Sequence, residues 1–94
     1  MVFAWHPAKA AANLKKHHID FREATVFDDL LSTTFPDADH SGSERRFLII
    51  GVSAHGRVLV VAYTEQAETV RIISARAATR RERTFYDEES PHTT

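Results

Sequence analysis

The 94-residue sequence contains no cysteine, three isolated glycines and three prolines. Without cysteine, disulfide bonds, thiolate metal ligands and cysteine nucleophiles are excluded. Isolated glycines do not form a glycine-rich loop, which binds phosphate through backbone N–H groups. The longest apolar runs, FLIIGV and VLVVAY, are too short to span a bilayer, and the N-terminus does not have the pattern of a secretory signal. We therefore expect no membrane segment, and the sequence is compatible with a reducing cytoplasm.

The composition is that of an ordinary globular protein, with 43% hydrophobic and 27% charged residues. This length allows one domain, which we expect over residues 1–89, followed by a disordered tail at 90–94. The net charge of −1 hides a strong asymmetry. Residues 17–44 carry seven acids and one base (7 − 1, a charge of −6), whereas residues 71–83 carry five arginines and one glutamate (5 − 1, a charge of +4). Any nucleic-acid binding must therefore come from a local patch.

The pattern of apolar and turn-forming residues predicts the element order β-α-α-β-β-β-β-α. This is an α+β domain, with a mainly antiparallel sheet, two N-terminal helices and one C-terminal helix. Asp20 and Glu23 are expected to form a capping box that starts the second helix, and Thr79 and Glu82 one that starts the last. The strands are expected at residues 2–5, 46–53, 57–64 and 69–75, with a weaker one in 33–43, and the helices at 7–17, from 21 to about 31, and up to about 89.

Two side-chain patterns predict which faces are buried. In the first helix, Ala8, Ala11, Ala12 and Leu14 form an apolar face, and Lys9, Asn13, Lys16 and His17 share the opposite face. In the strand at 69–75, alternation places Val70, Ile72 and Ser74 on one side and Arg71, Ile73 and Ala75 on the other.

The sequence predicts no metal site and no cofactor. Its six histidines include no HExxH or comparable spacing. The adjacent His17 and His18 diverge by about 100° on a helix and would not easily chelate one ion. The acidic pairs near Asp28 and Asp37 have the wrong residue order for a calcium loop.

The arginine cluster suits planar, bidentate contacts to phosphate or carboxylate. RNA cleavage by the ribose 2′-hydroxyl needs a base, an acid and fixed cations, but no metal. We predict Arg71 and Arg76 as phosphate-contacting catalytic groups and Lys9 or His17 as proton-transfer groups. Each residue also has a structural interpretation: Trp5 as core rather than a stacking surface, His17 as a partner of the helix dipole, and the arginines as a solvated helix face. Further RNA-binding candidates are Arg46, Arg80, Arg83 and Tyr86, of which Tyr86 has a helical spacing that could also reach the core.

Three segments carry a family resemblance: FAWHPAKAAANLKKHHIDFREATVFDD, ERRFLIIGVSAHGRVLVVAYTE and RIISARAATRRERTFYDE. In content, order and spacing the chain resembles the BrnT-type toxins of bacterial type II toxin–antitoxin modules, which have a RelE-like fold. Two positions depart from the family pattern. His6 replaces an acidic residue or Asn and should weaken the N-cap of the first helix, and His18 replaces a Gly at its end.

The resemblance implies a small cytoplasmic endoribonuclease that cuts RNA and blocks translation. It also implies a BrnA-type ribbon-helix-helix antitoxin, with operator DNA bound only through the toxin–antitoxin complex, and it allows a homodimer within that complex. It does not assign the general acid and base, because RelE-like toxins vary in those residues. A different function stays open: a non-enzymatic protein-binding module whose arginine face docks an acidic partner. The near-neutral net charge favours this alternative slightly.

Overall fold

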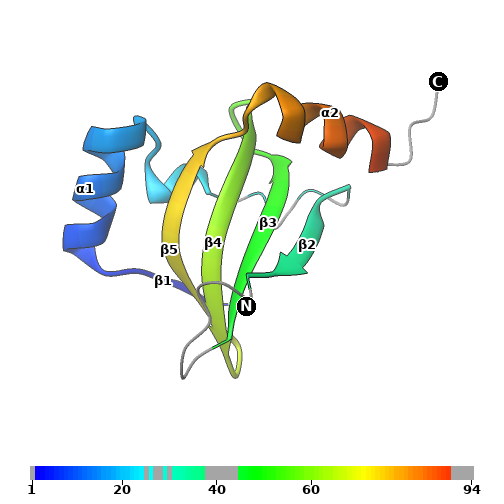
Figure 1. Cartoon of the computed structure of the whole chain (residues 1–94). Coiled ribbons are helices and arrows are strands. Elements are labelled where there is room, and N and C mark those ends of the chain that lie inside the picture. The colour runs from blue at the N-terminus through cyan, green and yellow to red at the C-terminus, as the bar shows by residue number, and fades with distance from the viewer. Residues whose placement is uncertain (1, 25, 27–28, 30, 38–44, 90–94) are drawn as a thin grey trace.

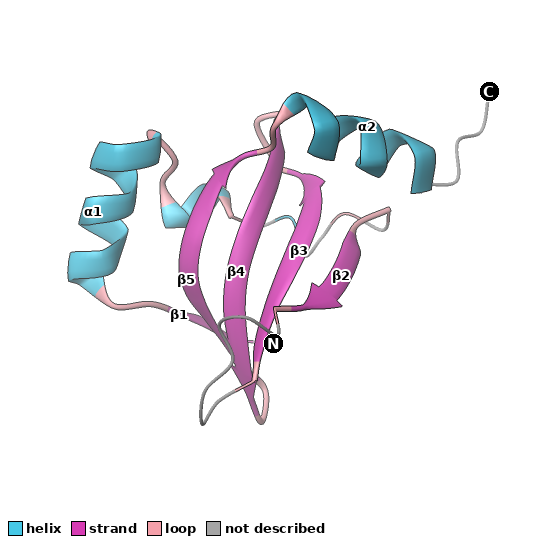
Figure 2. Cartoon of the chain, in the orientation of Figure 1, coloured by secondary structure: helices cyan, strands magenta, loops and turns pink. Residues whose placement is uncertain are grey.

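The computed structural model describes residues 2–24, 26, 29, 31–37 and 45–89, which form an α+β domain with a five-stranded sheet (Figures 1 and 2). The strand order is β1-β5-β4-β3-β2. The predicted tail at 90–94 and the loop at 38–44 lie outside the described residues. The strands are β1 (Val2–Ala4), β2 (Thr33–Pro36), β3 (Arg46–Val52), β4 (Val58–Gln66) and β5 (Thr69–Ala77), and the helices are α1 (Pro7–His17), the short 3₁₀ helix η1 (Phe21–Glu23) and α2 (Arg80–Glu89).

The predicted antiparallel meander is confirmed, because β2, β3, β4 and β5 pair in antiparallel order. The sheet is nevertheless mixed, since β1 pairs with β5 in parallel. One hydrophobic cluster lies on the side of the sheet that η1 covers, and a smaller cluster lies between the other side and α2. In Figure 1, α2 crosses one end of the sheet and α1 stands beside β5.

The prediction of a second N-terminal α-helix is wrong. Of the described residues in that region, Phe21–Glu23 form a short helix of the 3₁₀ type, Val26 has 3₁₀ geometry as well, and none is in an α-helix. Asp20 does cap it, accepting a hydrogen bond from the Arg22 N–H at 2.8 Å. Glu23 does not complete a capping box, because its carboxylate is buried and bonded to Ser53 and Arg57 on the β3–β4 connection. The segment is thus held by tertiary contacts that replace helical ones.

The burial predicted for α1 is also wrong. Leu14 is 47% exposed, whereas Asn13 is only 6% exposed. Asn13 faces β5 beyond the end of β1, where the strand would otherwise have an unpaired edge. Its Oδ1 accepts a hydrogen bond from Ala75 N–H at 3.1 Å, and its Nδ2 donates to Ala75 O at 2.8 Å and Ile19 O at 3.0 Å. An alanine or leucine side chain could not supply these bonds, so Asn13 turns toward the sheet. Ala10 packs against the larger core beside it, whereas Lys9 and Lys16 are exposed.

Both ends of α1 use histidine. His6 caps the helix, because its Nδ1 accepts a hydrogen bond from Ala8 N–H at 3.1 Å. His18 adopts the left-handed conformation that ends many helices, with φ of 59°. The helix therefore keeps ordinary end geometry despite both departures from the family pattern.

A β-bulge in β5 overturns the alternation predicted for this strand. Tyr63 pairs with Ile72 and Ala62 pairs with Ser74, so Ile73 is an extra residue on β5. Beyond it the alternation shifts by one position, as a bulge requires. Ala75 therefore joins Val70 and Ile72 in the larger core, and Ser74 moves to the opposite side.

Candidate functional site

The bulge brings Arg76 to the side of the sheet that Arg46 and Arg71 share. Residues that pair across strands share a face, and three such rows cross β3, β4 and β5 on the side of α2. We call this side the arginine face. Its rows are Ile50–Val60–Arg76, Leu48–Ala62–Ser74 and Arg46–Thr64–Arg71.

Arg46 and Arg71 lie at the end of the arginine face that is farther from α2. They flank Thr64, which is 5% exposed, from the two neighbouring strands. With neighbouring strands about 4.8 Å apart, their Cα atoms are roughly 10 Å from each other. The Arg71 side chain is exposed, while Nε of Arg46 lies 3.6 Å from Oδ2 of Asp37. Both guanidinium groups can thus reach one anionic chain that crosses the sheet.

Arg76 lies at the other end of this face, where it binds Glu82 of α2. Its Nη1 donates to Oε1 of Glu82 at 2.6 Å and its Nη2 donates to Oε2 at 2.9 Å. These bonds hold the pKa of Glu82 down, from 4.5 to about 2, and raise the pKa of Arg76. The two side chains are 39% and 28% exposed, so the pair lies at the border between α2 and solvent. The rows of Arg71 and Arg76 pass through Thr64 and Val60, which are four positions apart on β4, or roughly 13 Å along the strand.

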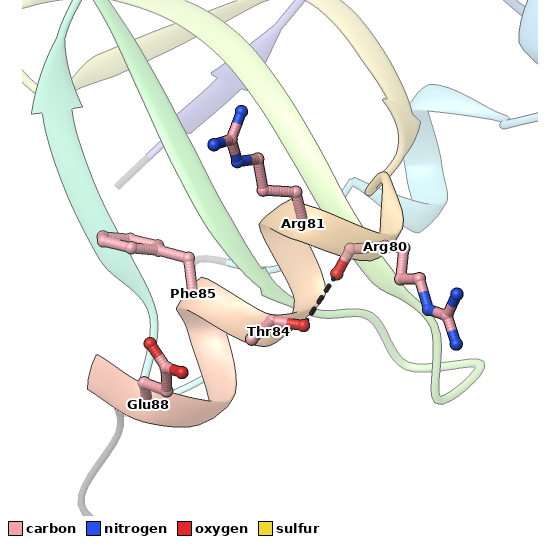
Figure 3. A pocket seen from close by; sticks show the side chains of 5 residues that line it. All are labelled: Arg80, Arg81, Thr84, Phe85 and Glu88. Atoms are coloured by element: carbon pink, nitrogen blue, oxygen red, sulfur yellow. Dashed lines mark hydrogen bonds between the residues drawn. The ribbon is translucent and has the colours of Figure 1, made fainter.

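The predicted capping box at the start of α2 is confirmed. Thr79 N–H donates to Oε1 of Glu82 at 2.9 Å, and Glu82 N–H donates to Oγ1 of Thr79 at 3.2 Å. Arg83 folds back to donate to Ala78 O at 3.3 Å. In Figure 3, Arg80 and Arg81 point in different directions from the first turn of the helix. The structure thus holds Arg83 at the helix start and leaves Arg80 on the exposed surface of α2.

Lys9 and His17 lie on α1 one turn to either side of Asn13, which bonds to the β5 edge. Helix α1 and strand β5 run in the same direction (Figure 1). Lys9 is exposed and His17 is partly buried. The two proton-transfer candidates therefore flank the edge of the same strand that carries Arg71 and Arg76.

Two aromatic candidates contribute to packing. Tyr86 is 6% exposed in the smaller core, and its hydroxyl donates to Oδ2 of Asp29 at 2.5 Å. The same carboxylate accepts bonds from the N–H groups of Leu31 and Val52, and together these hydrogen bonds outweigh the opposing effect of burial and lower the pKa of Asp29. Trp5 packs edge-on against Phe21 with ring centroids 6.1 Å apart. Tyr86 is therefore a core residue, and Trp5, which is partly buried, packs against the larger core.

The sequence shows the arginine-rich segment but not the partners of its side chains. The capping-box pattern indicates Glu82 as a cap, whereas its ion pair with Arg76 depends on how α2 meets β5. The pattern of α1 likewise gives no sign that Asn13 bonds to the edge of β5. Within the described part of the chain, no three His, Asp or Glu side chains gather as a metal ion would need. No described helix is long and apolar enough to cross a membrane.

Comparison with known proteins connects this arrangement to one family. Residues 5–82 match the family model of the ribonuclease toxin BrnT of type II toxin–antitoxin systems. The fold is similar to the 1.1 Å crystal structure of the Brucella abortus ribonuclease toxin BrnT, with a TM-score of 0.67 and 24% sequence identity. That alignment covers 85% of this chain and 100% of the Brucella chain. No match was found among curated protein sequences.

Proposed function

Because this chain belongs to the BrnT family of ribonuclease toxins of type II toxin–antitoxin systems, we propose that it is an endoribonuclease that cuts RNA without a metal ion. We further propose that cleavage inhibits translation in the cytoplasm, and that a BrnA-type antitoxin neutralises the toxin. The observation that carries the proposal is the arginine face, where Arg46, Arg71 and Arg76 share one side of the sheet.

The proposed reaction uses a nucleophile that the substrate itself supplies. The ribose 2′-oxygen bonds to the adjacent phosphorus, the bond from phosphorus to the 5′-oxygen breaks, and a 2′,3′-cyclic phosphate and a 5′-hydroxyl result. A base accepts the 2′-hydroxyl proton and an acid gives a proton to the leaving oxygen. Lys9 and His17 are the candidates for these transfers. Arg71 and Arg76 would stabilise the charge that develops on the phosphate oxygens, with Arg46, Arg80 and Arg83 as supporting cations.

Incubation of the purified protein with labelled RNA in excess chelator tests this proposal. We expect cleavage to persist, and to fall by about 10²–10³-fold when Arg71 is replaced by alanine, as for the loss of one charge-stabilising donor. The matched control is Arg45→Ala, because Arg45 stacks over Phe47 on the opposite side of the sheet. Absence of cleavage by a folded, antitoxin-free sample would refute the enzymatic proposal.

A second candidate function is a non-enzymatic module that binds an acidic protein. It is favoured by one observation: Arg46 and Arg76 already hold carboxylates, those of Asp37 and Glu82. Carboxylates of a partner could take their places. In that case the protein would bind the acidic partner through the arginine face and leave RNA uncut in the same assay.

A further inference from the structure

Glu82 occupies the fork of N–H groups that Arg76 would offer to a phosphate. The two parallel bonds, at 2.6 Å and 2.9 Å, join both terminal nitrogens of Arg76 to both carboxylate oxygens. Arginine binds carboxylate and phosphate with this same bidentate geometry. The same pair of N–H groups cannot hold Glu82 and an RNA phosphate at once.

The helix start gives Glu82 a second partner that does not depend on Arg76. Oε1 of Glu82 also accepts a hydrogen bond from Thr79 N–H at 2.9 Å. If Arg76 turned to another anion, Glu82 would keep this bond and α2 would remain capped. The exposed fractions, 39% for Arg76 and 28% for Glu82, leave both groups in contact with solvent. An exchange of partners therefore leaves no charge buried and unpaired.

Resting on the function proposed above, we propose that Glu82 is a built-in competitor for the RNA phosphate. Binding of RNA at Arg76 exchanges the Glu82 carboxylate for a phosphodiester oxygen. Glu82 thus lowers the affinity for RNA and limits the number of phosphates that the arginine face neutralises. Arg76 contacts RNA only when a phosphate displaces Glu82.

Protonation does not provide an alternative release near neutral pH. The hydrogen bonds from Arg76 hold the pKa of Glu82 at about 2, so this carboxylate is ionised throughout the neutral range. Exchange for another anion is then the route by which Arg76 becomes available. Any such exchange should appear in the salt dependence of binding.

The test compares Glu82→Gln with Thr79→Ala. Glutamine keeps an oxygen that can accept the Thr79 N–H bond and therefore preserves the capping box, but it removes the charge that binds Arg76. Thr79→Ala does the reverse, because it removes the hydroxyl that accepts from Glu82 N–H and leaves the ion pair. The probe is a single-stranded RNA oligomer methylated at every 2′-oxygen, which the enzyme cannot cut by the proposed route. Affinity is measured at several salt concentrations.

We expect Glu82→Gln to bind this oligomer severalfold more tightly than wild type. The slope of log K against log salt should steepen by about 0.7, the value for one additional phosphate contact with a single strand. Thr79→Ala should match wild type, and Glu82→Gln should have no effect in an Arg76→Ala background. Unchanged affinity and slope would overturn the inference, as would equal tightening in the Arg76→Ala background, which indicates a general charge effect.

Three further outcomes separate this inference from the proposed function. If the wild-type protein cuts ordinary RNA while Glu82→Gln binds the methylated oligomer as wild type does, only the competitor role is refuted. Slower cleavage by Glu82→Gln at saturating RNA, with unchanged binding, would also refute it and place Glu82 in the chemical step. If wild type neither binds nor cuts RNA, the proposed function itself fails.

Discussion

Replacement of Asn13 by alanine should destabilise this protein more than its position on a small surface helix suggests. The side chain makes three hydrogen bonds to the backbone of Ala75 and Ile19. Both of these residues are 0% exposed. Alanine would leave one N–H and two C=O groups in the core without these partners, and β1, the described strand on this edge of β5, pairs with β5 only as far as Arg71.

The magnitude follows from the number of bonds. Each buried backbone group that loses its partner costs about 1–3 kcal/mol, and we take the low end because Asn13 lies at the sheet edge where water can enter. The sum is roughly 3 kcal/mol, a large share of the about 5–15 kcal/mol that stabilises a typical domain. At about 4–8 °C per kcal/mol for a domain of this size, Tm should fall by roughly 12–24 °C.

Thermal and urea unfolding, followed by circular dichroism, measure this change. Lys16→Ala on the exposed surface of α1 is the control and should stay within about 0.5 kcal/mol of wild type. Asn13→Asp keeps the shape but cannot donate to the two carbonyl oxygens when ionised, so it should be at least as unstable as Asn13→Ala at pH 7. A loss below about 1 kcal/mol for Asn13→Ala would show that the β5 edge does not depend on this side chain.

Three other perturbations test separate contacts. Tyr86→Phe removes the bond to the Asp29 carboxylate and should cost about 1.5–3 kcal/mol in urea unfolding; an unchanged midpoint would contradict this. Gly51→Ala places a Cβ 3.1 Å from the Cβ atoms of Ser32 and Val26. Thermal melts should therefore show a loss of about 1–3 kcal/mol in the free energy of unfolding. An unchanged Tm would mean that these neighbours move aside at no cost. The pKa of Glu82 is lowered from 4.5 to about 2 in the folded protein. The contribution of this ionised carboxylate to the free energy of unfolding is therefore fully present above pH 4.5 and is lost as the pH falls through about 2. The difference in the free energy of unfolding between wild type and Glu82→Gln should therefore shrink on acidification. Urea unfolding between pH 7 and pH 3 measures this difference, and an increase would refute the prediction.

Much of the fold could be predicted because the signals are local. The three central strands are runs of β-branched and apolar residues separated by short turns, and the structure has them at nearly the predicted positions. The Thr79–Glu82 capping box is equally local and marks the start of α2. The single C-terminal helix and the antiparallel meander follow from these features.

The errors arise where a distant part of the chain decides the outcome. Glu23 looked like half of a capping box, but Ser53 and Arg57, far along the sequence, bind its carboxylate. Asn13 looked like part of a solvated face until the unpaired edge of β5 was known. For the candidate site, the types of residue could be chosen from sequence, whereas the partners of Arg46 and Arg76 depend on how β2 and α2 meet the sheet.

The extra residue at Ile73 decides which side of the sheet the later residues of β5 occupy. Five positions separate Arg71 from Arg76, an odd number that in a regular strand would send them to opposite sides. Deleting Ile73 would remove the bulge and leave four positions between the two arginines, an even number that a regular strand places on the same side. Two lengths of this segment therefore keep Arg76 on the arginine face and Ala75 in the larger core: the present length with its bulge, and a length one residue shorter without it.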